Sequence, residues 1–255
     1  MFSGSAAAAY DRFVGRYSPQ LAAALCDAAG IASGQQALDV GCGSGALAAE
    51  LARRLGPQNV TGIDPSEPFV EAARKRVPGA RIVVGSAEAL PFADDEFDAT
   101  LAQLVVNFLA DPERGVRELV RVTQHAGVVA GCVWDYRGEM TMLRTFWDAA
   151  AALDSEAADE GASMRFATPD ELRELWADAG LAQVRVAPLV VEASYEDFDD
   201  LWQPFTTGVG PAGAYTASLQ PERQAALRAE FARRLDSPDG AFTLSARVWC
   251  AVGTT

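Results

Sequence analysis

The chain has few of the residues that build metal centres and disulfide frameworks. It holds four cysteines and one histidine among 255 residues. The cysteines, Cys26, Cys42, Cys132 and Cys250, form no close pair in the sequence, and the lone His125 does not complete a cysteine–histidine cluster. We therefore expect no bound metal and four reduced thiols, as is typical of a cytoplasmic protein.

Long apolar runs and an excess of positive charge are also missing. No segment stays apolar over the roughly 20 residues that cross a bilayer, and residues 1–9 lack the basic start and apolar stretch of a signal peptide. The formal net charge is −14, and the main basic cluster, residues 74–76, lies near the end of a predicted helix, where cations are favoured. Because nucleic-acid binding needs a basic face, the composition favours a small neutral molecule as partner and a cytoplasmic location.

Strand and helix patterns alternate between residues 36 and 134. Short apolar runs that stop at glycine or polar turns predict strands at residues 36–40, 60–63, 81–84, 97–101 and 128–134. Apolar residues on one helical face predict helices at residues 46–55, 66–77 and 112–122. Such alternation is typical of βαβ units and predicts an α/β fold with a parallel sheet.

The alternation breaks after Trp134. Residues 136–166 read as helical, residues 169–179 as a helix that begins after Thr168, and residues 195–235 as mixed helical segments. Residues 184–191 and 242–252 are predicted strands. We expect a single domain, residues 1–255, with a core of about residues 20–135, 167–192 and 241–255. The insertions, about residues 136–166 and 193–240, are expected to form a mobile lid over one end of the sheet.

The sharpest local signal is a glycine-rich loop between the first predicted strand and helix, with the sequence DVGCGSG from Asp39 to Gly45. Glycines permit a tight turn and a close approach of a ligand to the backbone. Gly41, Gly43 and Ala46 also match the spacing of nicotinamide-binding loops. A carboxylate at Asp39 would oppose a pyrophosphate but suit an ammonium or sulfonium group, so it favours a different cofactor.

A second carboxylate, Asp64, ends the next predicted strand. In Rossmann-like folds an acid at this place binds both ribose hydroxyls of the cofactor. The alternative is that Asp64 caps the following helix together with Pro65 and Ser66. The glycine loop and Asp39 favour the ribose role.

These motifs together resemble those of class I S-adenosylmethionine-dependent methyltransferases. Residues 37–45 resemble their motif I, and residues 62–66 resemble their second-strand ribose motif. Residues 85–92, followed by Phe97 and Asp98, resemble the adenine-side loop of the type 11, ubiquinone/menaquinone-biosynthesis-like group. The resemblance covers about residues 10–134. It implies a Rossmann-like, seven-stranded, mostly parallel sheet with helices on both faces, an antiparallel last strand, and a helical lid inserted after strands 5 and 6.

The resemblance also implies where S-adenosylmethionine binds. Asp39 and the backbone of Gly41, Gly43 and Gly45 would hold the methionine end of the cofactor. Gln103 occupies the position whose backbone lies beside the methionine amino group.

The ribose and adenine would lie beside the next two strands. Asp64, next to Pro65, would accept from the ribose hydroxyls, and the Ala87 backbone would meet the adenine edge. Many relatives carry an aspartate where this chain has Ser86. Serine is shorter, so Ser86 and the neighbouring Glu88 are both candidates for the contact to the adenine amino group.

The amino-terminal stretch, residues 10–17, resembles the leading helix that closes on the cofactor in this family. Tyr10 and Arg16 are its candidate contacts, with Arg16 as a partner for the cofactor carboxylate. The alternative is that this helix only packs on the sheet.

No catalytic triad or metal is needed, because the sulfonium is itself a reactive methyl donor. The protein has to align the acceptor with the methyl group and exclude water. Asp135, Tyr136 and Glu139 are candidate acid–base groups, whereas His125 lies in a turn away from the expected site. The acceptor pocket would be lined by aromatic residues, which at helical spacing also suit a plain core: Trp134, Tyr136, Phe146 and Trp202, with Met140, Met142, Trp147 and Phe205 as further candidates.

Other functions remain open at this level. Two rivals are a nicotinamide-dependent oxidoreductase and a non-catalytic S-adenosylmethionine-binding module. Transfer of an aminopropyl or carboxymethyl group is a third use of the same fold. The sequence does not choose between O-, N- and C-methylation, and it does not indicate an oligomeric state.

Overall fold

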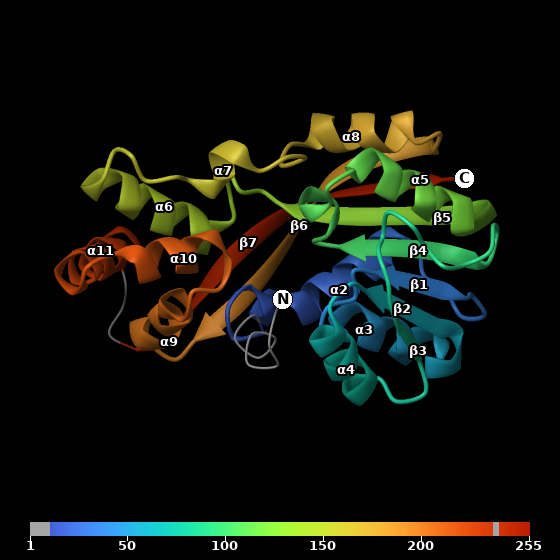
Figure 1. Cartoon of the computed structure of the whole chain (residues 1–255), viewed down its shortest axis with the longest axis horizontal. Coiled ribbons are helices and arrows are strands. Elements are labelled where there is room, and N and C mark those ends of the chain that lie inside the picture. Colours follow the sequence, from blue (N-terminus) through green and yellow to red (C-terminus); the bar gives the residue numbers. More distant parts are fainter. Residues whose placement is uncertain (1–10, 237–239) are drawn as a thin grey trace.

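One seven-stranded sheet organises the chain in this computed structural model, which describes residues 11–236 and 240–255 (Figure 1). The strand order is β3-β2-β1-β4-β5-β7-β6. The strands are β1 (Ala37–Val40), β2 (Val60–Asp64), β3 (Arg81–Val84), β4 (Phe97–Gln103), β5 (Thr123–Trp134), β6 (Ala182–Tyr195) and β7 (Phe242–Thr254).

The register places Asp39 where the strand order reverses. Strand β1 pairs in parallel with β2, with Asp39 opposite Gly62, and with β4, with Asp39 opposite Leu101. The chain leaves β1 toward β2 and β3 and returns on the other side as β4, and ligands of open α/β sheets bind at such a switch point. Strand β7 is antiparallel to both β5 and β6. The predicted sheet with an antiparallel last strand is thus confirmed.

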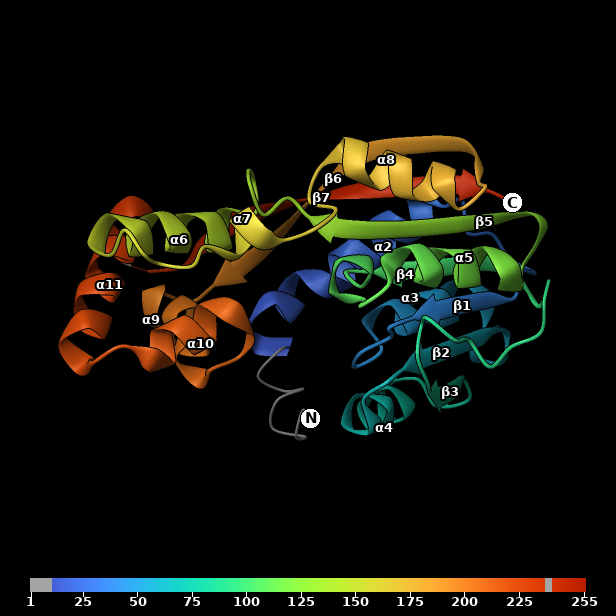
Figure 2. The ribbon, with the colours of Figure 1, turned by 45° about the horizontal axis from the view of Figure 1, so that its top comes forward.

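Helices cover both faces of the sheet (Figure 2). One group of neighbours is α2 (Ser18–Ala28), α3 (Ala46–Leu55) and α4 (Glu67–Arg76), in which α3 contacts both α2 and α4. A second group is α5 (Pro112–Val122) and α8 (Pro169–Asp178), which contact each other. Local signals explain two of these helices. Thr168 and Glu171 form a capping box at α8, and Asp111 caps α5 by accepting from the Arg114 N–H at 2.9 Å.

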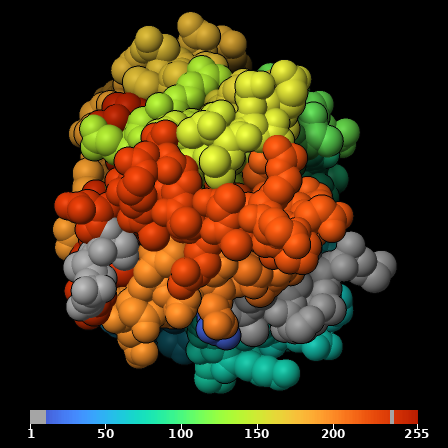
Figure 3. All heavy atoms as spheres, turned by 90° about the vertical axis from the view of Figure 1, so that its left-hand side faces the viewer, coloured from blue at the N-terminus to red at the C-terminus, as the bar shows by residue number. Residues whose placement is uncertain are grey.

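The remaining α-helices lie beyond the carboxyl ends of the parallel strands, at the left of Figure 1. We call this helical region the lid, and its mobility stays a prediction. Figure 3, which faces this end, shows it covered by residues 136–166 and 195–235, drawn in yellow-green and orange. Strands β6 and β7 extend into the lid, because their pairing reaches Tyr195 and Phe242 whereas β5 ends at Trp134. The lid helices are α6 (Thr141–Leu153), α7 (Glu160–Ser163), α9 (Phe198–Trp202), α10 (Gly210–Ser218) and α11 (Pro221–Arg234), with the 3-10 helix η4 (Gln203–Thr207).

The structure corrects three boundaries. The helical stretch predicted at residues 136–166 is broken, because α6 ends at Leu153 and six largely polar residues precede α7. Tyr195 belongs to β6 and not to the following helical segment, because it pairs with Phe242 of β7. His125 lies in the first part of β5, where its side chain is exposed.

Two further findings hold for the described residues, 11–236 and 240–255. No helix there is long and apolar enough to cross a membrane. No group of three or more histidine, cysteine, aspartate or glutamate side chains there is arranged to hold a metal ion.

Candidate cofactor site

The glycine loop needs its glycines for two separate reasons. Gly41 and Gly45 have φ angles of 69° and 86°, a left-handed conformation that is unfavourable for residues with a side chain. A Cβ on Gly41 would lie 2.5 Å from Val105 Cγ2, and one on Gly45 would lie 3.1 Å from Ala73 Cα. At Gly43, by contrast, a Cβ would meet no described atom within 4 Å. The loop is therefore packed on its inner side and open at Gly43, where a ligand can approach the backbone.

Asp39 is a buried carboxylate with one oxygen, Oδ2, that lacks a hydrogen-bond donor. Its residue exposure is 1%, and Oδ2 has no partner among the described residues. Burial raises the pKa of the Asp39 carboxyl to about 8. A hydrogen bond from the Ala48 backbone N–H lowers this pKa, and the negative charge of Asp64 raises it by a smaller amount. An unpaired buried acceptor costs about 1–3 kcal/mol, so a donor-bearing cation fits this position.

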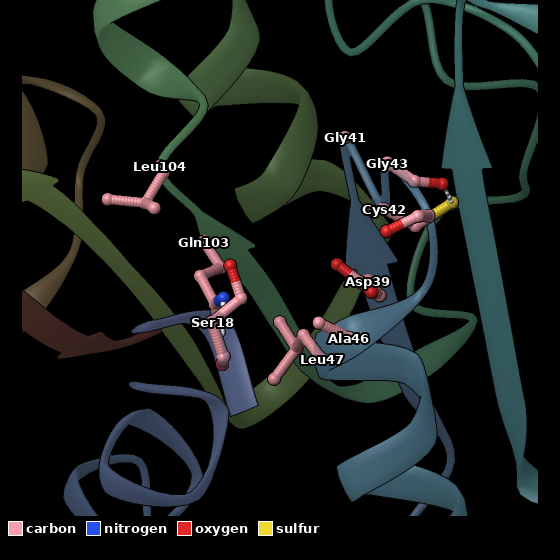
Figure 4. Close-up of a pocket in the computed structure, with 10 residues that line it drawn as sticks. Ser18, Asp39, Gly41, Cys42, Gly43, Ala46, Leu47, Gln103 and Leu104 are labelled. Atoms are coloured by element: carbon pink, nitrogen blue, oxygen red, sulfur yellow. Dashed lines mark hydrogen bonds between the residues drawn. The ribbon is translucent and has the colours of Figure 1, made fainter. Parts of the chain in front are cut away.

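Asp39 opens into a pocket at the carboxyl edge of the sheet (Figure 4). Figure 4 shows Asp39 and the glycine loop on one side of this pocket, and Gln103 with Ser18 on the other. The pocket is lined by Ser18, Asp39, Gly41, Cys42, Gly43, Ser44, Ala46, Leu47, Gln103 and Leu104. Leu104 has a φ of 61°, a conformation that costs energy in a non-glycine residue and that often marks a functional site.

Asp64 makes two backbone hydrogen bonds, one in the turn before α4 and one to the glycine loop. Its Oδ1 accepts from the Ser66 N–H at 2.9 Å, and its Oδ2 accepts from the Gly43 N–H at 3.0 Å. Burial raises the pKa of Asp64, opposed by these two hydrogen bonds. The Ser66 side chain does not cap α4, since its Oγ has no described partner. Each carboxylate oxygen of Asp64 keeps a second lone pair, so ribose binding stays a prediction beside these two observed hydrogen bonds.

The predicted adenine side lies on the loop after β3. Ala87 is buried and Ser86 is exposed, with Ser86 Oγ accepting from the Glu88 N–H at 3.1 Å. Glu88 Oε1 accepts from the N–H groups of Ala110 and Asp111 at 2.8 and 3.0 Å. Glu88 therefore ties this loop to the segment after β4, and the adenine contacts of these residues stay predictions. Pro65 is exposed at the start of the loop before α4.

The amino-terminal segment, defined here as residues 11–17, bridges the core and the lid. Arg16 donates to Asp200 at α9 from its two terminal guanidinium nitrogens and lies over the Tyr195 ring. Because Asp200 already pairs with this guanidinium, the predicted contact of Arg16 to the cofactor carboxylate stays a prediction. Tyr10 lies outside the described residues. In place of the expected single helix, this segment contains the 3-10 helix η1 (Val14–Tyr17), followed by α2.

The same segment contacts the glycine loop through Asp11, a residue that the sequence analysis did not single out. Ser44 Oγ donates to Asp11 Oδ1 at 2.7 Å, and Arg76 donates to Asp11 Oδ2 at 2.8 Å and to Ser44 Oγ at 3.1 Å. Arg76 was expected to be a solvated helix end. No local pattern could have revealed this network, because its three members are far apart in the sequence.

The loop after β4 carries another residue that was missed. Asn107 Oδ1 is buried and has no described partner, and Asn107 Nδ2 donates only to the weak acceptor Met164 Sδ, at 3.1 Å. Asn107 lies four residues beyond Gln103, in the 3-10 helix η3 (Val106–Phe108), and contacts Met164, which follows α7. This short helix gave no periodic signal by which to find it.

The candidate acceptor-pocket residues are all buried. Trp134 packs edge to face on Tyr17 at 5.6 Å between ring centroids, and Tyr136 is 5% exposed. Phe146 stacks on Phe205 at 4.5 Å, and Trp202 stacks on Phe205 at 6.1 Å. These contacts make Phe146 and Trp202 part of the aromatic core of the lid, and a substrate contact by any of the four stays a prediction.

The candidate acid–base carboxylates belong to an ion-pair network at the base of the lid. Arg247 contacts Asp135 Oδ2 at 2.6 Å and Glu139 Oε1 at 2.7 Å. Asp135 Oδ2 also accepts from the Glu139 N–H at 2.9 Å. Arg247 thus holds both carboxylates, and this arrangement is suited to fixing the chain segment that leads from β5 into the lid.

Comparison with known proteins agrees with this geometry. Residues 38–131 match the methyltransferase domain of type 11. A demethylmenaquinone methyltransferase from Roseiflexus castenholzii is 32% identical over 164 residues, which cover 58% of this chain and 68% of that protein. The chloroplastic 2-methyl-6-phytyl-1,4-hydroquinone methyltransferase 2 of rice, Oryza sativa subsp. japonica, is 38% identical over 93 residues, 36% of this chain and 27% of the rice protein. The match thus spans only about a quarter of the rice protein's length.

The fold is shared with solved structures as well. An S-adenosylmethionine-dependent methyltransferase from Thermotoga maritima is 21% identical, with a TM-score of 0.53 over 94% of this chain and 90% of that one. At this identity the likeness shows the fold alone, while the Roseiflexus relative and the domain match carry the family. The chain therefore belongs to the class I S-adenosylmethionine-dependent methyltransferases with the type 11 methyltransferase domain.

Proposed function

We propose that this protein transfers the methyl group of S-adenosylmethionine to a small apolar or aromatic molecule. The observation that carries the cofactor half is the unpaired, buried Oδ2 of Asp39 in a pocket beside the open Gly43. S-adenosylmethionine supplies an ammonium group that fits this acceptor and a sulfonium that carries the reactive methyl group. A nicotinamide cofactor would instead bring pyrophosphate charge toward Asp39.

The acceptor half rests on the aromatic core of the lid, which contacts the amino-terminal segment next to the pocket. Phe13, in the amino-terminal segment, packs edge to face on Phe205 of the lid, with 4.8 Å between the ring centroids. Phe13 comes five residues before Ser18, which lines the pocket, so this segment links the pocket to the aromatic core of the lid. Relatives named for a phytylhydroquinone and for demethylmenaquinone act on molecules of this apolar, ring-containing kind. An apolar acceptor is also consistent with a site that has to exclude water during transfer.

The chain's own residues would contribute alignment more than proton chemistry. Asp39 and Asp64 would fix the two ends of the cofactor, and the lid would press the acceptor toward the methyl group. Asn107, with its unpaired carbonyl oxygen, is suited to receive a hydroxyl or amino donor of the acceptor. The cytoplasmic location and the absence of a nucleic-acid partner stay predictions.

Transfer of labelled methyl from S-adenosylmethionine tests this function. The purified chain is incubated with methyl-tritiated S-adenosylmethionine and either 1,4-dihydroxynaphthalene or phosphoethanolamine, an apolar and a charged acceptor. We expect label in the organic extract with the hydroquinone, and the NMR chemical shift of the new methyl group then separates C- from O-methylation, which give products of equal mass. Label only on the charged acceptor would contradict the proposed acceptor class.

A further inference from the structure

A second buried acceptor without a donor lines the same pocket as Asp39. Gln103 Oε1 is buried, and no described residue donates a hydrogen bond to it. Gln103 ends β4, the strand that pairs with β1, so its side chain and that of Asp39 come from adjacent strands at one edge of the sheet. Figure 4 shows the two on opposite sides of the pocket.

The orientation of the Gln103 amide is fixed by the amino-terminal helix. Gln103 Nε2 donates to the Ser18 carbonyl oxygen at 3.3 Å, at the first residue of α2. The reverse orientation would place the amide oxygen against the Ser18 carbonyl oxygen, where two acceptors repel. Ser18 therefore keeps Gln103 Oε1 as the free atom of the amide.

Two unpaired acceptors in one pocket define the kind of group that satisfies both. An ammonium carries three N–H donors and a positive charge, so it can donate to a carboxylate and to an amide oxygen at once. A hydroxyl has a single donor and no charge, and a sulfonium has no donor. The pairing of Asp39 Oδ2 with Gln103 Oε1 thus matches a primary ammonium.

We propose that the Gln103 side chain is a positioning residue that accepts an N–H from the ammonium of the cofactor's amino-acid end, jointly with Asp39. This proposal rests on the proposed use of S-adenosylmethionine. The family resemblance assigns only the backbone of Gln103 to this end of the cofactor. Here the side chain adds a second acceptor and, through Ser18, links the ammonium position to the start of α2.

The test compares two ligands that differ only at the amino-acid end. S-adenosylhomocysteine carries the ammonium, whereas 5′-methylthioadenosine keeps the adenosine and thioether but lacks it. Gln103→Met removes the acceptor with little change in length. We expect calorimetry to show about 10-fold or more weaker binding of S-adenosylhomocysteine to this variant, because a hydrogen bond to a charged group is lost. Binding of 5′-methylthioadenosine should be unchanged.

Two controls separate this role from a structural one. Gln124→Met makes the same substitution at an exposed position of β5, outside the pocket lining, so neither ligand should lose affinity. The melting temperature of free Gln103→Met should stay close to that of the parent, because the variant loses an unpaired buried acceptor together with the long 3.3 Å hydrogen bond to Ser18.

Three results would overturn the proposal. Equal binding of S-adenosylhomocysteine by Gln103→Met and the parent would show that Oε1 is not used. Parallel losses for both ligands would show that Gln103 only shapes the pocket. If the folded parent binds neither ligand, the proposed function itself fails, and this inference fails with it.

Discussion

Asp64 accepts a hydrogen bond from the backbone N–H of Gly43 at 3.0 Å, so the carboxylate at the end of β2 and the glycine loop after β1 form one unit. The other oxygen of Asp64 holds the Ser66 N–H at the start of α4. One side chain thus fixes the shape of the loop and the entry to the next helix. In the proposed complex the same carboxylate also faces the ribose.

Replacing Asp64 by alanine should weaken S-adenosylhomocysteine binding by roughly 10- to 100-fold, because hydrogen bonds to the ribose are lost and the loop is loosened. The melting temperature should also fall, since two N–H groups lose their acceptor. Asp64→Asn should lose less, because its amide oxygen still accepts. Titration calorimetry and thermal melting measure both effects, with Asp178→Ala, at an exposed position of α8, as the neutral control. Unchanged affinity in Asp64→Ala would remove the ribose assignment.

Cofactor affinity should depend on pH through Asp39. Burial raises the pKa of this carboxyl to about 8 in the free protein, and a bound ammonium favours the charged form. Below about pH 8 binding must therefore release a proton, and the affinity for S-adenosylhomocysteine should rise up to about 10-fold per pH unit before levelling. Asp39→Asn should bind weakly and lack this dependence, so any slope that remains belongs to the ligand. The same slope in both proteins would contradict the assignment.

Asp39 also affects the stability of the free protein, in the opposite direction with pH. Its pKa in the folded state lies above the ordinary value of 3.8. Its contribution is fully present below that ordinary value and is lost as the pH rises through about 8. The stabilisation given by a saturating ligand should therefore be larger at pH 8 than at pH 6.

Arg76 should matter to the cofactor site although its neighbour Arg74 does not. Arg76 joins Asp11 to Ser44 of the glycine loop, whereas Arg74 donates to Ile82 O and pairs with exposed Glu67. Because the Arg76–Asp11 pair is about one-third exposed, Arg76→Ala should weaken S-adenosylhomocysteine binding only a few-fold. Arg74→Ala is the matched control and should bind like the parent. Equal losses in the two variants would point to a general effect of charge.

The lid should become more protected when the cofactor binds. Arg16 and Asp200, each about one-fifth exposed, join the amino-terminal segment to α9. We expect S-adenosylhomocysteine to slow hydrogen exchange in α6 and α9, and Arg16→Ala to speed exchange in α9 of the free protein. Arg173→Ala, in an exposed pair within α8, should change neither. Exchange that stays the same with and without ligand in both helices would argue against a mobile lid.

The parts of the fold that were predicted from the sequence depend on local patterns. The glycine loop, the helices Ala46–Leu55 and Pro112–Val122 and the strand Arg81–Val84 are bounded by their own turn, cap and apolar residues. The full length of β6 was not predictable, because its last residues are held by pairing with β7 and by the lid. Helix α2 was not assigned either.

The residues of the candidate site also divide into those that a local sequence pattern predicted and those that only the structure revealed. Asp39 and Asp64 were found because each ends a predicted strand beside a glycine loop or a helix start. The Asp11–Ser44–Arg76 network, the capture of Arg16 by Asp200 and the unpaired Oε1 of Gln103 arise only when distant segments meet. Aromatic residues at helical spacing suited a core and a pocket equally well, and the structure shows their packing in the lid.

The central claim is that this chain binds S-adenosylmethionine through the pocket at Asp39. Titration calorimetry with S-adenosylhomocysteine, on protein shown to be folded by its melting transition, tests it most directly. We predict saturable binding of one ligand per chain, a raised melting temperature, and no comparable binding of NADH. The absence of binding at millimolar S-adenosylhomocysteine, on folded protein, would contradict it.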